Sequence, residues 1–217
     1  MRLVLPRLYV ILDAALLTLP EIDCAKSLVD AGVRLIQYRN KNASARQLFE
    51  KSRELAAFLS PLGVRFVVND RADVAALADA GGVHVGQDDL GVEQARSVMG
   101  NDKWVGVSTH NVQQFRDAVA TSADYVAVGP IFSTGSKTNP DPVVGVDFVR
   151  QARSVSDKPI VAIGGITLER AMEVIEAGAD SLAVIGDILR AENPGKRARQ
   201  YVDVLEKQNS GIVERGA

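Results

Sequence analysis

Eight short apolar segments alternate with segments of helical spacing along this 217-residue chain, and that alternation restricts the fold more than any other feature. Short runs that are apolar on both faces are typical of parallel strands covered by helices. Eight such units predict a closed (β/α)8 TIM barrel, an α/β fold, and an open doubly wound sheet is the alternative. The predicted strands cover residues 8–12, 33–39, 65–69, 83–86, 104–108, 124–129, 160–164 and 181–185.

The chain is predicted to form one domain, because no linker or low-complexity segment divides it. The last helix is expected at about residues 194–207, so the barrel domain covers residues 1–207. Residues 208–217 are predicted to form a disordered tail.

The composition excludes several classes of function. The net charge is −2, the positive residues are scattered and only 5% of residues are aromatic, so no nucleic-acid surface is expected. No apolar run approaches the roughly 20 residues that cross a bilayer, and residues 1–7 are too short for a signal peptide. We therefore expect a cytoplasmic protein without membrane contact. Cys24 is the only cysteine, so an internal disulfide is impossible.

The stretch from Val67 to Asp89 predicts a strand, a helix and a second strand, with an acid just beyond each strand. Parallel neighbours joined by a right-handed crossover end at the same edge of a sheet. Because adjacent strands lie about 4.8 Å apart, Asp70 and Asp89 are close enough to share one small hard cation. The alternative is that each aspartate caps the helix that follows it.

In a barrel of this kind the active site lies at the carboxyl ends of the strands. The polar side chains at the predicted ends are Gln37, Arg39, Lys41, Asn69, Asp70, Gln87, Asp89, Ser108, Thr134, Ser136 and Lys137. Two cationic clusters with two carboxylates between them suit a metal-bound diphosphate.

Each of these side chains also has a structural interpretation. Gln37 and Arg39 point to one side of a strand, and inside a barrel they need a ligand or a structural ion pair as a partner. The two lysines can be solvated surface residues, and Ser108 can cap the following helix. His84 lies in the middle of a strand and is interpreted as a packed histidine.

Glycines follow the seventh and eighth predicted strands. In barrels these two loops often hold a phosphate through backbone N–H groups, and glycine lets the backbone approach its oxygens closely. Gly164-Gly165 and Gly186 therefore predict a phosphate site, with two plain strand-to-helix turns as the alternative.

Taken together, these residues resemble the thiamine phosphate synthase family. The matching stretches are Q-Y-R-N-K (37–41), V-N-D-R-A-D-V-A (68–75), G-V-H-V-G-Q-D-D (82–89), G-V-S-T-H (106–110), D-Y-V-A-V-G-P-I-F-S-T-G-S-K (124–137) and A-I-G-G-I (162–166). They run in family order from the first predicted strand region to the last.

The resemblance implies an enzyme that joins 4-amino-2-methyl-5-(diphosphooxymethyl)pyrimidine to thiazole phosphate, giving thiamine phosphate and diphosphate. The substitution would be dissociative and assisted by Mg²⁺, which Asp70 and Asp89 would bind. Catalytic roles would fall to Arg39, Lys41, Ser108 and Lys137. Substrate contacts are implied for Gln37, Tyr38, Arg39, Asn40, Lys41, Asn69, Ser108, Thr134, Gly135, Ser136, Lys137, Gly165, Ile185 and Gly186.

The chain departs from the family pattern in two loops. The family usually reads P-T-x-T-K where this chain has Ser133 to Lys137, although Ser136 keeps a hydroxyl. Gly186 is followed by Asp187, an acid that disfavours a nearby phosphate unless its side chain points away.

Two other functions remain as alternatives: a thiazole tautomerase on the same scaffold, and a non-catalytic phosphate-binding barrel. The partners expected are small-molecule substrates. A homo-oligomer is compatible with the sequence.

Overall fold

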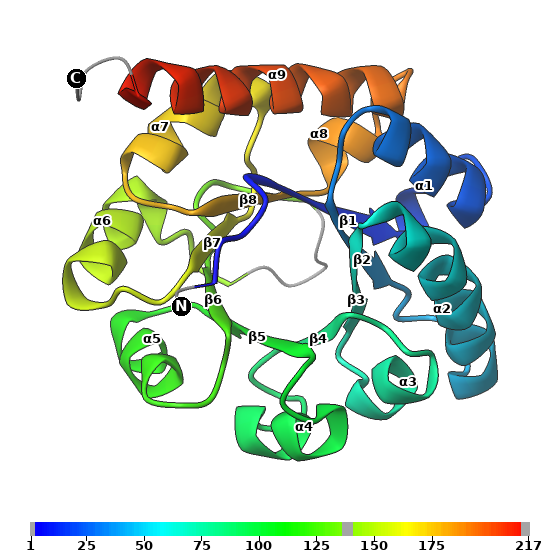
Figure 1. Cartoon of the computed structure of the whole chain (residues 1–217). Coiled ribbons are helices and arrows are strands. Elements are labelled where there is room, and N and C mark those ends of the chain that lie inside the picture. The colour runs from blue at the N-terminus through cyan, green and yellow to red at the C-terminus, as the bar shows by residue number, and fades with distance from the viewer. Residues whose placement is uncertain (1–2, 136–140, 214–217) are drawn as a thin grey trace.

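The computed structural model describes residues 3–135 and 141–213, and its eight parallel strands close into a barrel (Figure 1). Each strand pairs with the next along the chain, and β8 pairs with β1. The closure confirms the predicted (β/α)8 fold and excludes the open sheet. The strands are β1 Leu8–Asp13, β2 Leu35–Arg39, β3 Arg65–Asn69, β4 Gly82–Val85, β5 Trp104–Thr109, β6 Tyr125–Val128, β7 Ile160–Ile163 and β8 Ser181–Val184.

Helices surround the barrel as an outer ring (Figure 1). They are α1 Glu21–Asp30, α2 Ala45–Leu59, α3 Ala72–Leu77, α4 Val92–Met99, α5 Val112–Val119, α6 Gly145–Val155, α7 Ala171–Glu176, α8 Gly186–Leu189 and α9 Pro194–Val213. Short 3₁₀ turns lie at Ala14–Leu16, Ser60–Leu62 and Leu168–Arg170. None of the helices in the described part of the chain combines the length and apolar character that crossing a membrane requires.

The last helix differs from its predicted extent. Residues 208–213 continue α9, where the sequence predicted the beginning of a disordered tail. Glu206, Lys207 and Gln208, at the junction with the predicted tail, are good helix formers. Residues 208–213 contain no proline that would stop the helix. Residues 214–217 lie outside the described part of the chain. The four-residue α8 was not predicted, because one helical turn carries no periodicity to read.

The strands are buried on both faces, as their apolar sequences predict. Alternate residues of β1 illustrate this: Tyr9 and Ile11 belong to the cluster inside the barrel, whereas Val10 packs outside it against the helices. The inner cluster includes Tyr125, for which Gly106 makes room. A Cβ atom at Gly106 would lie 2.1 Å from Cζ of that ring, so only glycine, which has no side chain, fits at this position of β5.

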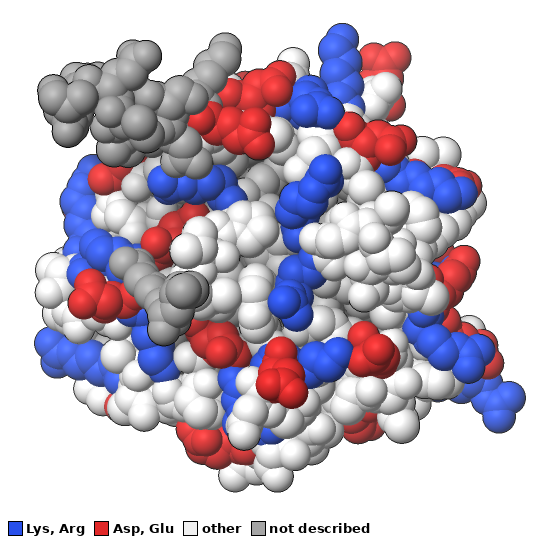
Figure 2. Space-filling view, viewed as in Figure 1, with Lys and Arg blue, Asp and Glu red and all other residues white. Residues whose placement is uncertain are grey.

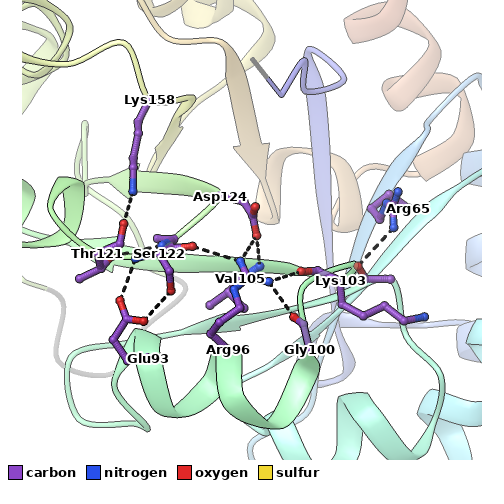
Figure 3. A network of polar contacts seen from close by, with 12 residues as sticks. Arg65, Glu93, Arg96, Gly100, Lys103, Val105, Thr121, Ser122, Asp124 and Lys158 are labelled. Atoms are coloured by element: carbon purple, nitrogen blue, oxygen red, sulfur yellow. Dashed lines mark hydrogen bonds and ion pairs between the residues drawn. The ribbon is translucent and has the colours of Figure 1, made fainter. Parts of the chain in front are cut away.

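An aspartate at the start of β6 ties three elements together at the N-terminal end of the barrel (Figure 3). Asp124 Oδ2 accepts a hydrogen bond from the Val105 N–H at 2.7 Å and forms an ion pair with Arg96 of α4. The same guanidinium donates to the carbonyls of Gly100 and Lys103 at 3.0 and 2.6 Å. This clasp fixes α4 and the start of β5 to β6.

The same arrangement recurs at the start of β8. Asp180 Oδ2 accepts from the Ile160 N–H at 2.8 Å and forms an ion pair with Arg153 of α6. The two arginines lie at the same place in a repeated sequence, Q-A-R-S-V, at 94–98 and 151–155. The barrel therefore uses one clasp twice, two strands apart.

Figure 2 shows the face nearest the viewer in Figure 1, which the chain crosses before it enters β1. Lys and Arg are interspersed there with Asp and Glu, and neither sign covers this face. Such a surface matches the small net charge of the chain.

We expect Asp124→Ala to lower the free energy of unfolding by about 2 kcal/mol, because hydrogen bonds to charged groups contribute roughly 1.5–3 kcal/mol. Urea unfolding followed by circular dichroism measures this change. Asp147→Ala is the matched control, since that aspartate pairs with Arg150 on the exposed face of α6 and should change stability by less than about 0.5 kcal/mol. Equal unfolding midpoints for the two variants would contradict the clasp.

Candidate active site

A cavity of about 80 Å³ lies inside the barrel, toward the carboxyl ends of the strands. Its lining is polar along β2 to β5 and apolar along β6 to β8. The lining residues are Tyr9, Ile11, Gln37, Arg39, Asn69, His84, Ser108, Ala127, Val161, Ile163, Ala183 and Ile185. Every strand contributes to this cavity, which suits a ring with one polar edge and apolar faces.

Two side chains of β1 satisfy the polar residues of β2. Arg39 forms an ion pair with Asp13, whose side chain is only 3% exposed. Gln37 Nε2 donates to the Tyr9 hydroxyl at 2.6 Å. Both predicted residues therefore line the cavity and also have partners within the chain. The sequence analysis missed Asp13 and Tyr9, because their roles depend on the pairing of β1 with β2.

The two predicted metal ligands approach one another from neighbouring strands. Asp70 follows β3 in a left-handed conformation with φ 64°, and its carboxylate lies 3.0 Å from Lys41 Nζ. Asp89 Oδ2 accepts from the Gly86 N–H at 2.7 Å. Partial burial raises the pKa of Asp89, and the nearby Asp70 carboxylate raises it further, while Lys41 opposes both effects.

Neither aspartate caps a helix. The residue at the N-cap of α3 is Arg71, and the residue at the N-cap of α4 is Gly91. The capping interpretation of Asp70 and Asp89 is therefore wrong. Ser108 is not a cap either, because Asn111 caps α5 by accepting from the Gln114 N–H at 2.9 Å.

The carboxylate pair fits a magnesium ion that a substrate completes. Within residues 3–135 and 141–213, no group of three or more His, Cys, Asp or Glu side chains is placed to hold a metal alone. Mg²⁺ commonly binds through one or two carboxylates together with substrate phosphates and water. Two neighbouring carboxylates, one of them directly after Asn69 of the cavity lining, match this donor set.

The loops after β6, β7 and β8 line a second hollow of about 240 Å³. Its lining includes Ser133, Thr134, Gly135, Gly164, Gly165, Thr167, Ile185, Gly186, Asp187 and Arg190. Gly165 has φ 62°, and a Cβ atom there would lie 2.3 Å from the Ser133 carbonyl oxygen. The close approach of the loops after β6 and β7 therefore requires glycine at this position.

Helix α9 engages both oxygens of Asp187. Arg197 donates to them from Nε at 3.0 Å and from Nη2 at 3.1 Å. The Tyr201 hydroxyl donates to Oδ2 at 2.6 Å. These contacts neutralise the acid that the sequence places next to the predicted phosphate site, and none of them was predicted.

Of the remaining predicted site residues, Tyr38 and Asn40 face away from the cavity or toward each other. Tyr38 packs outside the barrel, where its hydroxyl donates to Glu21 at 3.2 Å and accepts from Asn40. The Tyr38 side chain therefore faces away from the cavity, since side chains alternate along a strand and its neighbours face inward, and its contact with substrate stays a prediction. Asn40 is turned toward Tyr38 by that hydrogen bond. Ser136 and Lys137 lie outside the described residues.

His84 is part of the cavity rather than of the packed core alone. Its Nε2 lies 2.9 Å from Ser108 Oγ and its Nδ1 lies 3.1 Å from the Tyr125 hydroxyl. The available signal was alternation: Val83 and Val85 face the helices, so the histidine between them faces the barrel interior.

The chain is similar to known proteins over most of its length. A model of the family described as "Thiamine monophosphate synthase" matches residues 8–188. The chain belongs to this family. It is 51% identical over 208 residues to the thiamine-phosphate synthase of Koribacter versatilis, covering 93% of this chain and 96% of that protein. It is 44% identical to that of Chloroflexus aurantiacus, covering 89% and 90%.

A solved structure of thiamine phosphate pyrophosphorylase from Pyrococcus furiosus superposes with a TM-score of 0.84 at 31% identity, covering 93% of this chain and 96% of that one. These relatives support thiamine-phosphate synthase function, a transferase activity in thiamine biosynthesis, for the chain. They favour neither the tautomerase nor the non-catalytic barrel.

We expect Asp70→Asn to lower the pKa of Asp89, because removing a neighbouring negative charge makes the second carboxylate easier to ionise. Carbon-detected NMR titration of the metal-free enzyme measures this pKa. Asp88→Asn is the control, since that exposed acid is the adjacent residue. The proposed proximity of the two carboxylates fails if both variants leave the Asp89 titration where it is in the wild type.

Proposed function

We propose that the chain condenses 4-amino-2-methyl-5-(diphosphooxymethyl)pyrimidine with thiazole phosphate, releasing diphosphate and forming thiamine phosphate. The observation that carries this proposal is the approach of Asp89 to Asp70, the residue that directly follows Asn69 of the cavity lining. That cavity is polar on one side and apolar on the other. Family membership supports the enzyme class, and these residues support the substrates.

The pyrimidine suits the barrel cavity. An aminopyrimidine has hydrogen-bonding nitrogens along its edge and apolar faces. Gln37, Asn69 and Ser108 supply polar groups on one side of the cavity, and Val161 and Ile163 supply apolar contacts on the other. The ring would bind with its edge toward β2 to β5.

The diphosphate would lie at the rim, beside the carboxylates and the cations. Arg39 is held at the cavity by Asp13, and Lys41 stands beside Asp70. These cations, with Lys137 by its match to the family motif, would neutralise the leaving group as it departs. When bound by Asp70 and Asp89, Mg²⁺ would supply further positive charge to the diphosphate oxygens.

The aminopyrimidine ring of the substrate favours a dissociative substitution. This electron-rich ring stabilises positive charge on the carbon that loses diphosphate. The thiazole nitrogen that attacks carries no proton, and no general base is needed for that step. The task of the protein is therefore to bind both substrates in line and to neutralise developing charge.

The thiazole phosphate suits the hollow lined by the loops after β6, β7 and β8. Thr134 and Gly135 border it on one side, and Gly165, Ile185 and Gly186 border it on the other. Ser136 would add a hydroxyl by its position in the family motif. Glycine backbones let N–H groups approach the phosphate oxygens, and α9 neutralises the neighbouring acid.

The direct test mixes both substrates with enzyme and Mg²⁺ and detects thiamine phosphate by its fluorescence after oxidation. Asp89→Ala should lower kcat by about 10² or more, because it removes half of the carboxylate pair that binds the metal. Asp88→Ala is the control, and circular dichroism verifies that both variants fold. Full turnover by Asp89→Ala, or by enzyme treated with chelator, would refute the metal role.

A second test addresses the phosphate site. Arg197→Ala removes the positive charge that pairs with the Asp187 carboxylate and should raise the KM for thiazole phosphate about tenfold, equivalent to about 1.4 kcal/mol. Adding Asp187→Asn to this variant should restore much of the affinity, because it removes the charge. Arg199→Ala is the control on the same helix, since that side chain donates to the Asp30 carbonyl. An equal rise in the KM for the pyrimidine substrate would argue against this assignment.

A further inference from the structure

A chain of hydrogen bonds crosses the inside of the barrel from β2 to β5. Gln37 Nε2 lies 2.6 Å from the Tyr9 hydroxyl, which lies 3.1 Å from the hydroxyl of Tyr125. The Tyr125 hydroxyl lies 3.1 Å from His84 Nδ1, and His84 Nε2 lies 2.9 Å from Ser108 Oγ. Gln37, Tyr9 and Tyr125 are each no more than 2% exposed, so water does not compete along the inner part of the chain.

We propose that this series of hydrogen bonds positions Ser108. The Gln37 amide fixes the direction of every hydrogen bond in the series, so that Ser108 presents its proton to the cavity. The proposal deepens the proposed function, on which its catalytic meaning rests. Tyr9, Tyr125 and His84 are then positioning residues that act through Ser108.

The direction follows from which groups can donate. An amide nitrogen only donates, so the Tyr9 hydroxyl accepts from Gln37 and gives its own proton to Tyr125. Tyr125 in turn donates to His84 Nδ1, so the neutral imidazole carries its proton on Nε2 and donates to Ser108. Ser108 Oγ has then accepted one hydrogen bond, and its own proton is left for a ligand.

Burial keeps the two phenols neutral. It raises the pKa of Tyr9 and of Tyr125 well above the ordinary value for tyrosine. A phenolate at either position would accept from both neighbours and break the direction of the chain. Both hydroxyls therefore remain able to accept on one side and donate on the other.

Packing holds the rings in the positions that the chain needs. The His84 and Tyr125 rings stack with centroids 5.6 Å apart and planes 21° apart. The Tyr9 ring meets Tyr125 edge to face, with centroids 6.1 Å apart. Gly106 leaves the space that the Tyr125 hydroxyl fills. The tyrosines thus cannot turn aside to form other hydrogen bonds without repacking the barrel.

The consequence for binding is that Ser108 selects a hydrogen-bond acceptor. Ser108 lines the cavity beside His84 and Asn69. A ring nitrogen or a diphosphate oxygen of the pyrimidine substrate fits this donor. Without the chain, the serine hydroxyl would be divided between donating to His84 and donating to the ligand.

The tautomer of His84 reports the direction without any substrate. The protein has only two histidines, and His110 serves as an internal reference because its Nδ1 lies 2.6 Å from the Gly129 carbonyl oxygen and therefore carries a proton. Long-range ¹H–¹⁵N NMR at pH 8 should find the His84 proton on Nε2. A proton on Nδ1 of His84 in the wild type would overturn the proposal.

Gln37→Glu tests the source of the direction with almost no change of shape. A carboxylate only accepts, so Tyr9 must then donate to residue 37 and the whole chain reverses. The His84 proton should move to Nδ1, and the KM for the pyrimidine diphosphate should rise. A His84 that keeps its proton on Nε2 in this variant would show that Gln37 does not set the direction.

Tyr125→Phe removes the central hydroxyl and keeps the ring. It should give a mixture of His84 tautomers and raise the KM for the pyrimidine substrate about tenfold, with a smaller effect on kcat. Thr109→Val is the matched control, since it removes a buried hydroxyl of β5 that donates to the Ala127 carbonyl. Equal KM values and tautomers in the two variants would overturn the proposal. Because the NMR readout needs no turnover, the positioning of Ser108 and the proposed function can fail separately.

Discussion

The pairing of β1 with both β2 and β8 is the constraint on which the site depends. This pairing closes the sheet, and its register sets Asp13 directly beside Arg39. It also brings Tyr9 to within hydrogen-bond distance of Gln37 and Tyr125. A slip of one residue would turn every side chain of β1 to the other face and remove both partners at once. The organisation of the cavity is therefore a property of barrel closure.

The two ends of the barrel use charge for different purposes. At the N-terminal end, Asp124 and Asp180 each combine one backbone N–H with one arginine, and these contacts join neighbouring strands to a helix. At the carboxyl end, Asp70 adopts a left-handed conformation and stands near a second carboxylate. Like charges and an unfavourable backbone conformation both destabilise a fold. Stabilising groups at one end thus accompany strained, charged groups at the other.

Sequence reasoning located most of the fold because each strand is apolar on both faces and each helix has one inner face. Local spacing also marks helix starts: Ser44 caps α2, and its hydroxyl accepts from the Gln47 N–H in a capping box. Boundaries were less certain: residues 208–213 were predicted to belong to a tail, but they continue α9. The approach of Asp70 to Asp89 was predictable, since neighbouring parallel strands end side by side.

The parts of the site that were not predicted depend on contacts between distant segments. Asp13 meets Arg39 only through strand register, and Asp187 is engaged by α9 only after the barrel has closed. His84 resembled a packed residue because valines flank it, and its role depends on Tyr125 from two strands away. Spacing within one segment carries no information about such partners.

These internal partners explain how a site of buried charges exists before any ligand arrives. A buried polar group without a hydrogen bond destabilises the fold, so the guanidinium of Arg39 is held by Asp13. Binding a ligand therefore adds to oriented groups and requires little rearrangement of them. Lys41 differs, because its side chain is 56% exposed and exposed ion pairs contribute little free energy. On the proposed function, exchange of its pairing with Asp70 would free the lysine for the diphosphate and the carboxylate for Mg²⁺ in one step.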